Sequence, residues 1–165
     1  DTRDEIKEKN KQIHEGVFTA MADPKDPYVP PAVEEIPPFI NFAPLENALE
    51  VLNRSAERYD KAVRTAGGKS LSDETLRSVN QKLIQSERKL THQSGLPLRP
   101  WFKHLIYAPG YYTGYGVKTI PGVREAIEQK RWKEAEGEVL RVALALENEA
   151  ALIDAASKDL ESAGR

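Results

Sequence analysis

LPLRPWFKHLIYAPGYYTGYGVKTIPG, residues 96–122, is the stretch that decides how the chain is organised. Its prolines each remove a backbone donor and fix φ, so no long helix can run through it, and its glycines permit turns that other residues resist. Periodic helical patterns lie on both sides. Because binding residues are often carried on loops held by a rigid scaffold, we expect functional side chains here.

The flanking sequence predicts four long helices and one short one. The long helices are expected over residues 1–22, 45–66, 70–91 and 132–161, and the short one over residues 121–131. The predicted buried stripe of the second helix is Leu45, Leu49, Leu52, Ala56, Tyr59 and Val63. The third helix is predicted to be N-capped by Ser72 and to bury Leu76, Val79, Leu83 and Leu90. We therefore expect an all-α fold, an up-and-down helical bundle with a long Tyr/Gly loop.

Residues 23–44 form a proline-rich connector. Its prolines predict an extended, polyproline-like path where it does not turn. The apolar side chains expected to pin it onto a helix are Ile36, Phe39, Ile40 and Phe42.

Composition limits the classes of protein to which the chain can belong. Its 165 residues fit one domain, and 30% charged and 39% hydrophobic residues are typical of a globular chain. A net charge of −2 predicts no nucleic-acid partner, and no apolar run approaches the roughly 20 residues that span a bilayer, so we expect no direct membrane insertion. The chain starts at Asp1, inside a predicted helix, from which we expect a fragment of a larger protein.

The sequence holds no catalytic constellation that we recognise. HExxH, Gly-x-Ser-x-Gly and phosphate-binding glycine-loop motifs are absent, and there is no cysteine. The three histidines, His14, His92 and His104, lie in separate segments, so no metal site is predicted. His104 is interpreted as a hydrogen-bonded structural histidine. We expect the chain itself to be non-catalytic and to need no cofactor.

The last predicted helix carries an unusually wide apolar sector. Besides one buried face, it has Leu140, Leu144 and Ala151. A stripe this broad suggests contact with the helix's own bundle and with something else, and its many alanines allow close helix approach. We predict Leu140, Leu144 and Ala151 as dimer-interface residues.

LPLRPWFKHLIYAP, followed by the Tyr/Gly loop and IPG, resembles the C-terminal helical domain of the transferrin receptor and glutamate carboxypeptidase II family, the transferrin receptor-like dimerisation domain. The opening DTRDEI and the closing EVLRVALALENEAALIDAA resemble it too. The resemblance thus spans nearly the whole chain, although residues 23–69 agree only in general character.

This resemblance implies a single helical dimerisation domain over residues 1–165. It also implies a homodimer and a preceding peptidase domain of the same chain, which would hold zinc if the parent is an active carboxypeptidase or aminopeptidase. The family suggests a parent in the secretory pathway, in a vacuole or anchored to a membrane. The alternative is a protein-ligand-binding helical module of a metal-free, receptor-like member.

The loop after IYAP carries a more specific implication of the resemblance. In glutamate carboxypeptidase II a Lys-Tyr pair there contacts the substrate's terminal carboxylate, since a cation and a phenol hydroxyl both donate to it. The matching tyrosine is Tyr115, but Gly114 stands at the lysine position, which puts specificity for an acidic residue in doubt. Lys118 is not expected to replace that lysine. Packing of Tyr115 against its own domain is the alternative to a substrate-binding role.

Three further expectations concern single sites. Asn53-Arg54-Ser55 is an N-glycosylation sequon, with a chance match as the alternative. Arg99 is expected to pair with a carboxylate of the last helix or of the peptidase domain. The residues predicted to be core at the base of the loop are Trp101, Phe102, Leu105, Ile106 and Tyr107.

Overall fold

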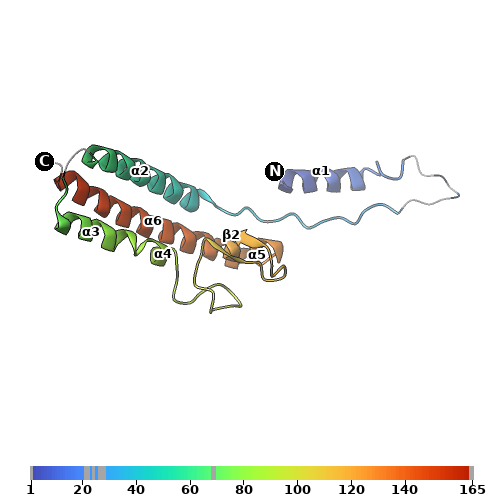
Figure 1. The fold of residues 1–165 in the computed structure, drawn as a ribbon. Helices are drawn as coiled ribbons and strands as arrows, with labels where there is room; N and C mark the ends of the chain where they lie inside the picture. Colours follow the sequence, from blue (N-terminus) through green and yellow to red (C-terminus); the bar gives the residue numbers. More distant parts are fainter. Residues whose placement is uncertain (1, 21–22, 24, 26–28, 68–69, 164–165) are drawn as a thin grey trace. The chain divides into compact units, whose positions relative to one another are not determined.

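The computed structural model describes residues 2–20, 23, 25, 29–67 and 70–163. It is mainly helical, as predicted, and also holds a small antiparallel sheet that the sequence did not predict (Figure 1). The elements are α1 (Thr2–His14), α2 (Ala43–Ala66), α3 (Asp73–Leu83), α4 (Ser86–Lys89), β1 (Tyr107–Pro109), β2 (Val117–Thr119), α5 (Pro121–Glu128) and α6 (Trp132–Ala163). The chain divides into two compact units, Asp1–Phe39 and Ile40–Arg165, which are described separately.

The first unit contains α1 and most of the connector. The prediction that its helix runs to residue 22 was wrong, because α1 ends at His14 and residues 15–20 form turns around Gly16, whose φ is +70°. The connector is held to α1 by Asn10, whose side-chain amide donates to the Glu34 carbonyl (2.7 Å) and accepts from the Glu34 amide (2.9 Å). Ile36 and Phe39 are exposed, so polar bonds rather than these two side chains fix this segment. The other two residues predicted to pin the connector, Ile40 and Phe42, belong to the second unit and pack against its core.

In the second unit, α6 lies between α2 and α3 and packs against both (Figure 1). The helix α2 runs parallel to α6, so Arg58 in its second half reaches Glu161 near the end of α6 at 2.7 Å. The helix α3 runs the opposite way: Ser78 Oγ donates to Asp159 (2.7 Å), and Ser86 Oγ, at the start of α4, donates to Glu149 (2.5 Å). None of the helices in the described residues is both long and apolar enough to cross a membrane.

The buried core forms two clusters along α6. The larger surrounds its first half, where Val139, Val142 and Leu146 meet Leu96 and Leu105 of the 96–122 stretch. The smaller lies near its end and contains Ala62, Ala66, Val79, Ala156 and Leu160. The larger cluster therefore joins the 96–122 stretch to the helical scaffold.

The predicted stripes of α2 and α3 were only partly right. On α2 the buried residues are the small ones, Ala48, Ser55, Ala62 and Ala66, while Leu49 and Val63 are exposed. The small side chains let α2 approach α6 closely. The predicted stripe of larger side chains therefore lies at the edge of the contact between the two helices. On α3 only Val79 is buried, and Leu76 and Leu83 are exposed.

The helix predicted over residues 70–91 is interrupted. Ser72 caps α3 as expected, with its Oγ accepting from the Thr75 amide at 3.2 Å. However, α3 ends at Leu83, and α4 is a single turn. Beyond it the backbone pairs with the 96–122 stretch instead, because the Leu105 amide donates to the Leu90 carbonyl (2.9 Å).

The close contact between α2 and α6 should be sensitive to added volume. We predict that Ala62→Leu, at a 5% exposed position, lowers the free energy of unfolding by about 1–3 kcal/mol, since extra methylenes in a packed contact force side chains and backbone apart. Ala56→Leu, at an exposed position of the same helix, is the matched control. Urea unfolding measures both, and an equal effect of the two substitutions would contradict the packing described here.

Candidate functional site

The base of the Tyr/Gly loop is built on a buried ion pair. Arg99 and Glu125 are 3% and 5% exposed, and Arg99 Nη2 lies 2.8 and 2.9 Å from the two carboxylate oxygens of Glu125. Phe102 and Tyr111 flank the guanidinium carbon, with ring centroids 5.2 and 5.8 Å away. The expectation that Arg99 pairs with the last helix or with another domain was wrong. Its partner is on the short helix α5.

The same two side chains hold the backbone where the loop leaves β1. Arg99 Nη1 donates to the Pro109 carbonyl, and the Tyr111 amide donates to Glu125 Oε1 at 2.7 Å. Gly110 lies between these two peptide groups. One buried ion pair, Arg99 with Glu125, therefore hydrogen-bonds the backbone on both sides of Gly110.

The loop itself closes on a short hairpin. Tyr107 pairs with Thr119 and Pro109 with Val117, and the Gly110 amide donates to the Gly116 carbonyl (2.9 Å). Gly114 has a φ of +57°, a conformation that favours glycine, and the space beside it is open. This turn leaves Tyr115 fully exposed.

The other aromatic residues divide differently from the prediction. Leu105 is buried and Phe102 and Ile106 pack on the core, but Trp101 is 69% exposed and Tyr107 is also exposed, so core was the wrong assignment for these two. Tyr111 and Tyr112 form an edge-to-face pair with centroids 4.8 Å apart.

Two side chains near the loop are already engaged. His104 Nε2 lies 3.0 Å from a Glu87 oxygen, and its ring centroid lies 4.0 Å from that of Tyr107 with the rings tilted by 36°, so the histidine is hydrogen-bonded as expected. Lys118 pairs with Glu128 and is not presented at the loop tip. Lys118 therefore does not replace the lysine that the resemblance implies at position 114.

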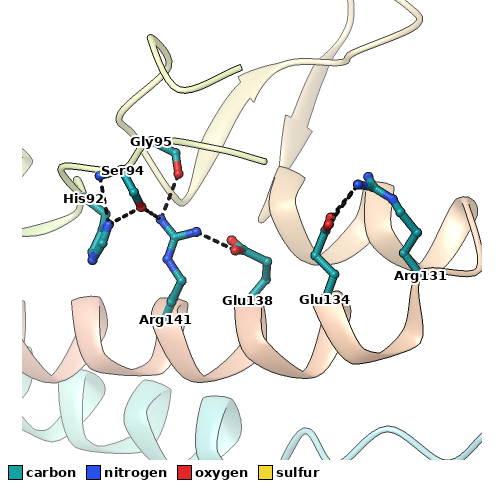
Figure 2. Close-up of polar contacts among 7 residues, drawn as sticks. All are labelled: His92, Ser94, Gly95, Arg131, Glu134, Glu138 and Arg141. Carbon is teal, nitrogen blue, oxygen red and sulfur yellow. Dashed lines mark hydrogen bonds and ion pairs between the residues drawn. The ribbon is translucent and has the colours of Figure 1, made fainter. Parts of the chain in front are cut away.

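A second anchor holds the segment that leads into the stretch (Figure 2). Arg141 of α6 donates to Ser94 Oγ (3.0 Å) and to the Gly95 carbonyl (2.8 Å), and its Nη1 lies 2.5 Å from Glu138. Gly95 has a φ of +66°, and a Cβ there would lie 2.2 Å from the Pro100 carbonyl oxygen. Only glycine fits this entry turn.

Glu138 lies deep beneath the stretch. It is 5% exposed, and a Cβ added to Gly122 would come within 2.4 Å of its Oε2. Burial raises the pKa of Glu138, whereas Arg141 lowers it and the negative charge of Glu134, one turn earlier, adds to the rise. Glu138, Arg141 and Glu125 were missed by the sequence analysis, because nothing in their local pattern separates them from solvated charges.

The three predicted interface residues lie on the outer side of α6. Leu140 and Leu144 are 58% and 56% exposed, and Ala151 is exposed as well. A second apolar surface is a groove of about 400 Å³ between α2 and α3, with Val63, Leu76, Leu83 and Leu160 among its lining residues.

Asn53 is exposed on α2, while Ser55 of the same sequon is buried. A glycan on Asn53 would therefore have to be attached before α2 packs against α6. Within the residues that the structure describes, no group of three or more His, Cys, Asp or Glu side chains could hold a metal ion.

A family model described as the transferrin receptor-like dimerisation domain matches residues 40–154. The chain belongs to this family. The match takes in the 96–122 stretch with both of its anchors.

The chain is similar to segments of several longer proteins. The chain is 40% identical over 78 residues to a "probable glutamate carboxypeptidase" of Arabidopsis thaliana, which is 43% of the chain and 12% of that relative. It is 31% identical over 91 residues to a protein of the same description from Arthroderma benhamiae, 55% of the chain and 12% of the relative. An "inactive zinc metalloprotease" of Schizosaccharomyces pombe is 36% identical over 72 residues, 44% of the chain and 9% of the relative. The chain thus spans only a small part of these relatives.

The buried carboxylate of this dimerisation domain should give stability a defined pH dependence. Because the pKa of Glu138 is raised in the folded state, the folded protein binds this proton more tightly than the unfolded chain. The contribution of Glu138 to the free energy of unfolding is therefore present below the unfolded pKa and lost as pH rises through the folded pKa.

We predict that wild type gains stability relative to Glu138→Gln as pH falls from about 7 to about 4. Urea unfolding of both proteins at each pH measures the difference. Glu136→Gln, which removes an exposed charge from the same helix, is the control. A difference between wild type and Glu138→Gln that stays constant with pH would contradict the assignment.

Proposed function

We propose that the chain is the non-catalytic helical homodimerisation domain of a glutamate carboxypeptidase-like protein, and that it follows a peptidase domain of the same chain. The family match supports self-association. The observation that carries the proposal is the pair Leu140 and Leu144, more than half exposed on a helix whose opposite face forms the core. Exposed leucines one turn apart on a rigid helix are suited to a helix from a second copy.

The outer face of α6 is the proposed contact for three reasons. Leu140, Leu144 and Ala151 recur at helical spacing on one side, so they form a continuous stripe. The opposite face of α6 is buried in the core, so the helix cannot turn to bury Leu140 and Leu144 within its own domain. Ala151 is small enough to let a second backbone come close.

Charge on this stripe should weaken the dimer without unfolding the domain. We predict that Leu144→Lys in the full-length protein raises the dimer dissociation constant by about tenfold or more, because a buried ammonium group would be left unpaired at the contact. Sedimentation over a range of concentrations measures it, and circular dichroism checks the fold.

Leu76→Lys, at an exposed apolar position of α3, is the matched control. If Leu144→Lys leaves the dimer dissociation constant unchanged and Leu76→Lys raises it, the dimer interface is the groove between α2 and α3 and not the outer face of α6. Loss of folding in Leu144→Lys would show that the position is part of the core.

We further propose that the Tyr/Gly loop lines the substrate pocket of the peptidase domain and that Tyr115 donates its phenol hydroxyl to a substrate carboxylate. Its full exposure on a hairpin whose base is buried supports this role, because the hydroxyl is available while the backbone below it is held. Zinc would belong to the peptidase domain and not to the described residues of this chain.

The missing lysine gives this proposal a gain-of-function test. Gly114→Lys should lower KM for a dipeptide ending in glutamate by several-fold, since an ammonium group is added beside Tyr115, where the space is open. The positive φ of Gly114 will cost about 1 kcal/mol, which limits the gain. Gly114→Met, which adds a similar length without charge, is the control. An equal effect of both substitutions would contradict a carboxylate pocket at this loop.

The second candidate is a protein-ligand-binding module in a metal-free parent, and the similarity to an "inactive zinc metalloprotease" favours it. Zinc content of the purified full-length protein separates the two. A parent that binds no zinc would leave dimerisation in place and remove the peptidase pocket.

A further inference from the structure

We propose that Arg99 and Glu125 are a positioning pair for the Tyr/Gly loop, setting the direction in which residues 110–116 leave the hairpin and hence where Tyr115 is presented. Its consequence for substrate binding rests on the proposed pocket role of Tyr115. The pair is distinct from the residues that would touch substrate, since both side chains are buried beneath the loop.

The argument starts from which groups the pair binds. A buried ion pair could satisfy itself, but here each partner also bonds the loop backbone. Arg99 Nη1 reaches the Pro109 carbonyl, while Glu125 Oε1 accepts from the Tyr111 amide at 2.7 Å. The two peptide groups on either side of Gly110 are thus fixed by side chains that are also fixed to each other.

The rest of the hairpin transmits this constraint to the tip. The Gly110 amide donates to Gly116 (2.9 Å), and the Gly114 amide donates back to the Gly110 carbonyl (3.1 Å). A Cβ on Gly110 would lie 2.2 Å from Thr113 Oγ1, so the turn closes tightly over this residue. Residues 110–116 therefore form one small hydrogen-bonded unit whose orientation depends on the peptides that flank Gly110.

Planar geometry makes arginine specific for this task. The guanidinium presents donors in a fixed fork, so it can bind the Glu125 carboxylate and the Pro109 carbonyl simultaneously. A lysine ammonium keeps the positive charge but lacks the planar arrangement of donors. If Arg99 acts only through its charge, Arg99→Lys should leave the loop unchanged. If Arg99 positions the loop, Arg99→Lys should loosen it.

The decisive variant removes the polar bonds and keeps the packing. Single substitutions leave an unpaired buried charge and can unfold the domain, but replacing both partners by apolar residues of similar size is often tolerated. We therefore use Arg99→Met/Glu125→Met in the full-length protein. The control is Lys82→Met/Asp159→Asn, which removes another ion pair between α3 and α6.

Hydrogen exchange read by mass spectrometry is the first measurement. We expect amides of residues 110–116 to exchange about tenfold faster or more in the Arg99/Glu125 double variant and in Arg99→Lys, with protection of α2 and α6 retained. The control should leave the loop unchanged. Unchanged exchange in the loop of a folded double variant would overturn the positioning role.

The second measurement separates this inference from the pocket proposal. If Tyr115 binds substrate, the double variant should raise KM for a dipeptide ending in glutamate with little change in kcat, as Tyr115→Phe should. Faster loop exchange without a change in KM in either variant would uphold the positioning pair and overturn the pocket role of Tyr115.

Discussion

Burial of one face of α6 is the constraint on which the rest of the second unit depends. The helices α2, α3, α4 and α5 all pack against it, so they are related to one another mainly through α6. Its buried face mixes valine and leucine with alanine, and the alanines allow α2 to come close. Where helices alone surround α6, near its end, the core is small and a groove stays open. Around its first half, Leu96 and Leu105 fill the space, which places the loop at the end of the scaffold with the larger buried core.

Paired charges fix the backbone of the 96–122 stretch, in addition to the apolar contacts that Leu96 and Leu105 make with the core. It contains little regular structure, so its backbone groups need partners that helices and sheets would otherwise supply. Arg99 and Glu125 supply them at the loop, and Arg141 supplies one at the entry turn of residues 94–95, just before the stretch. Burying ions in this way adds little net stability, because desolvation offsets the attraction. The buried ion pairs instead define the path of the backbone, because each hydrogen bond is directional and has a specific partner.

Sequence periodicity predicted the helical class and two of the four long helices well, α2 and α6, because leucine and valine recur on the buried side of an amphipathic helix. It misplaced the face of α2, since Ala48 and Ala62 carry too little hydrophobic signal to outweigh the neighbouring leucines. It also missed β1 and β2, which are three residues each and too short for any period to show. At the site, the unusual composition of the stretch predicted a long loop, and Tyr115 is fully exposed on it. The substrate-binding role of Tyr115 stays a prediction. The partner of Arg99 could not be predicted, because Glu125 has no local feature that distinguishes it from an exposed glutamate.

The two apolar surfaces of the second unit point in different directions. Leu144 on the outer stripe and Leu160 in the groove are 16 positions apart, which at 100° per residue rotates them by about 160° around α6. One partner cannot cover both surfaces by lying flat against the helix. In the proposed arrangement, the domain would contact both a peptidase domain and a second copy of the chain, and would need two such surfaces. The Tyr/Gly loop lies at the opposite end of α6 from the groove. It could therefore contact the proposed substrate pocket without involving either apolar surface. This separation would let the proposed association and the proposed substrate contact depend on different residues of one small scaffold.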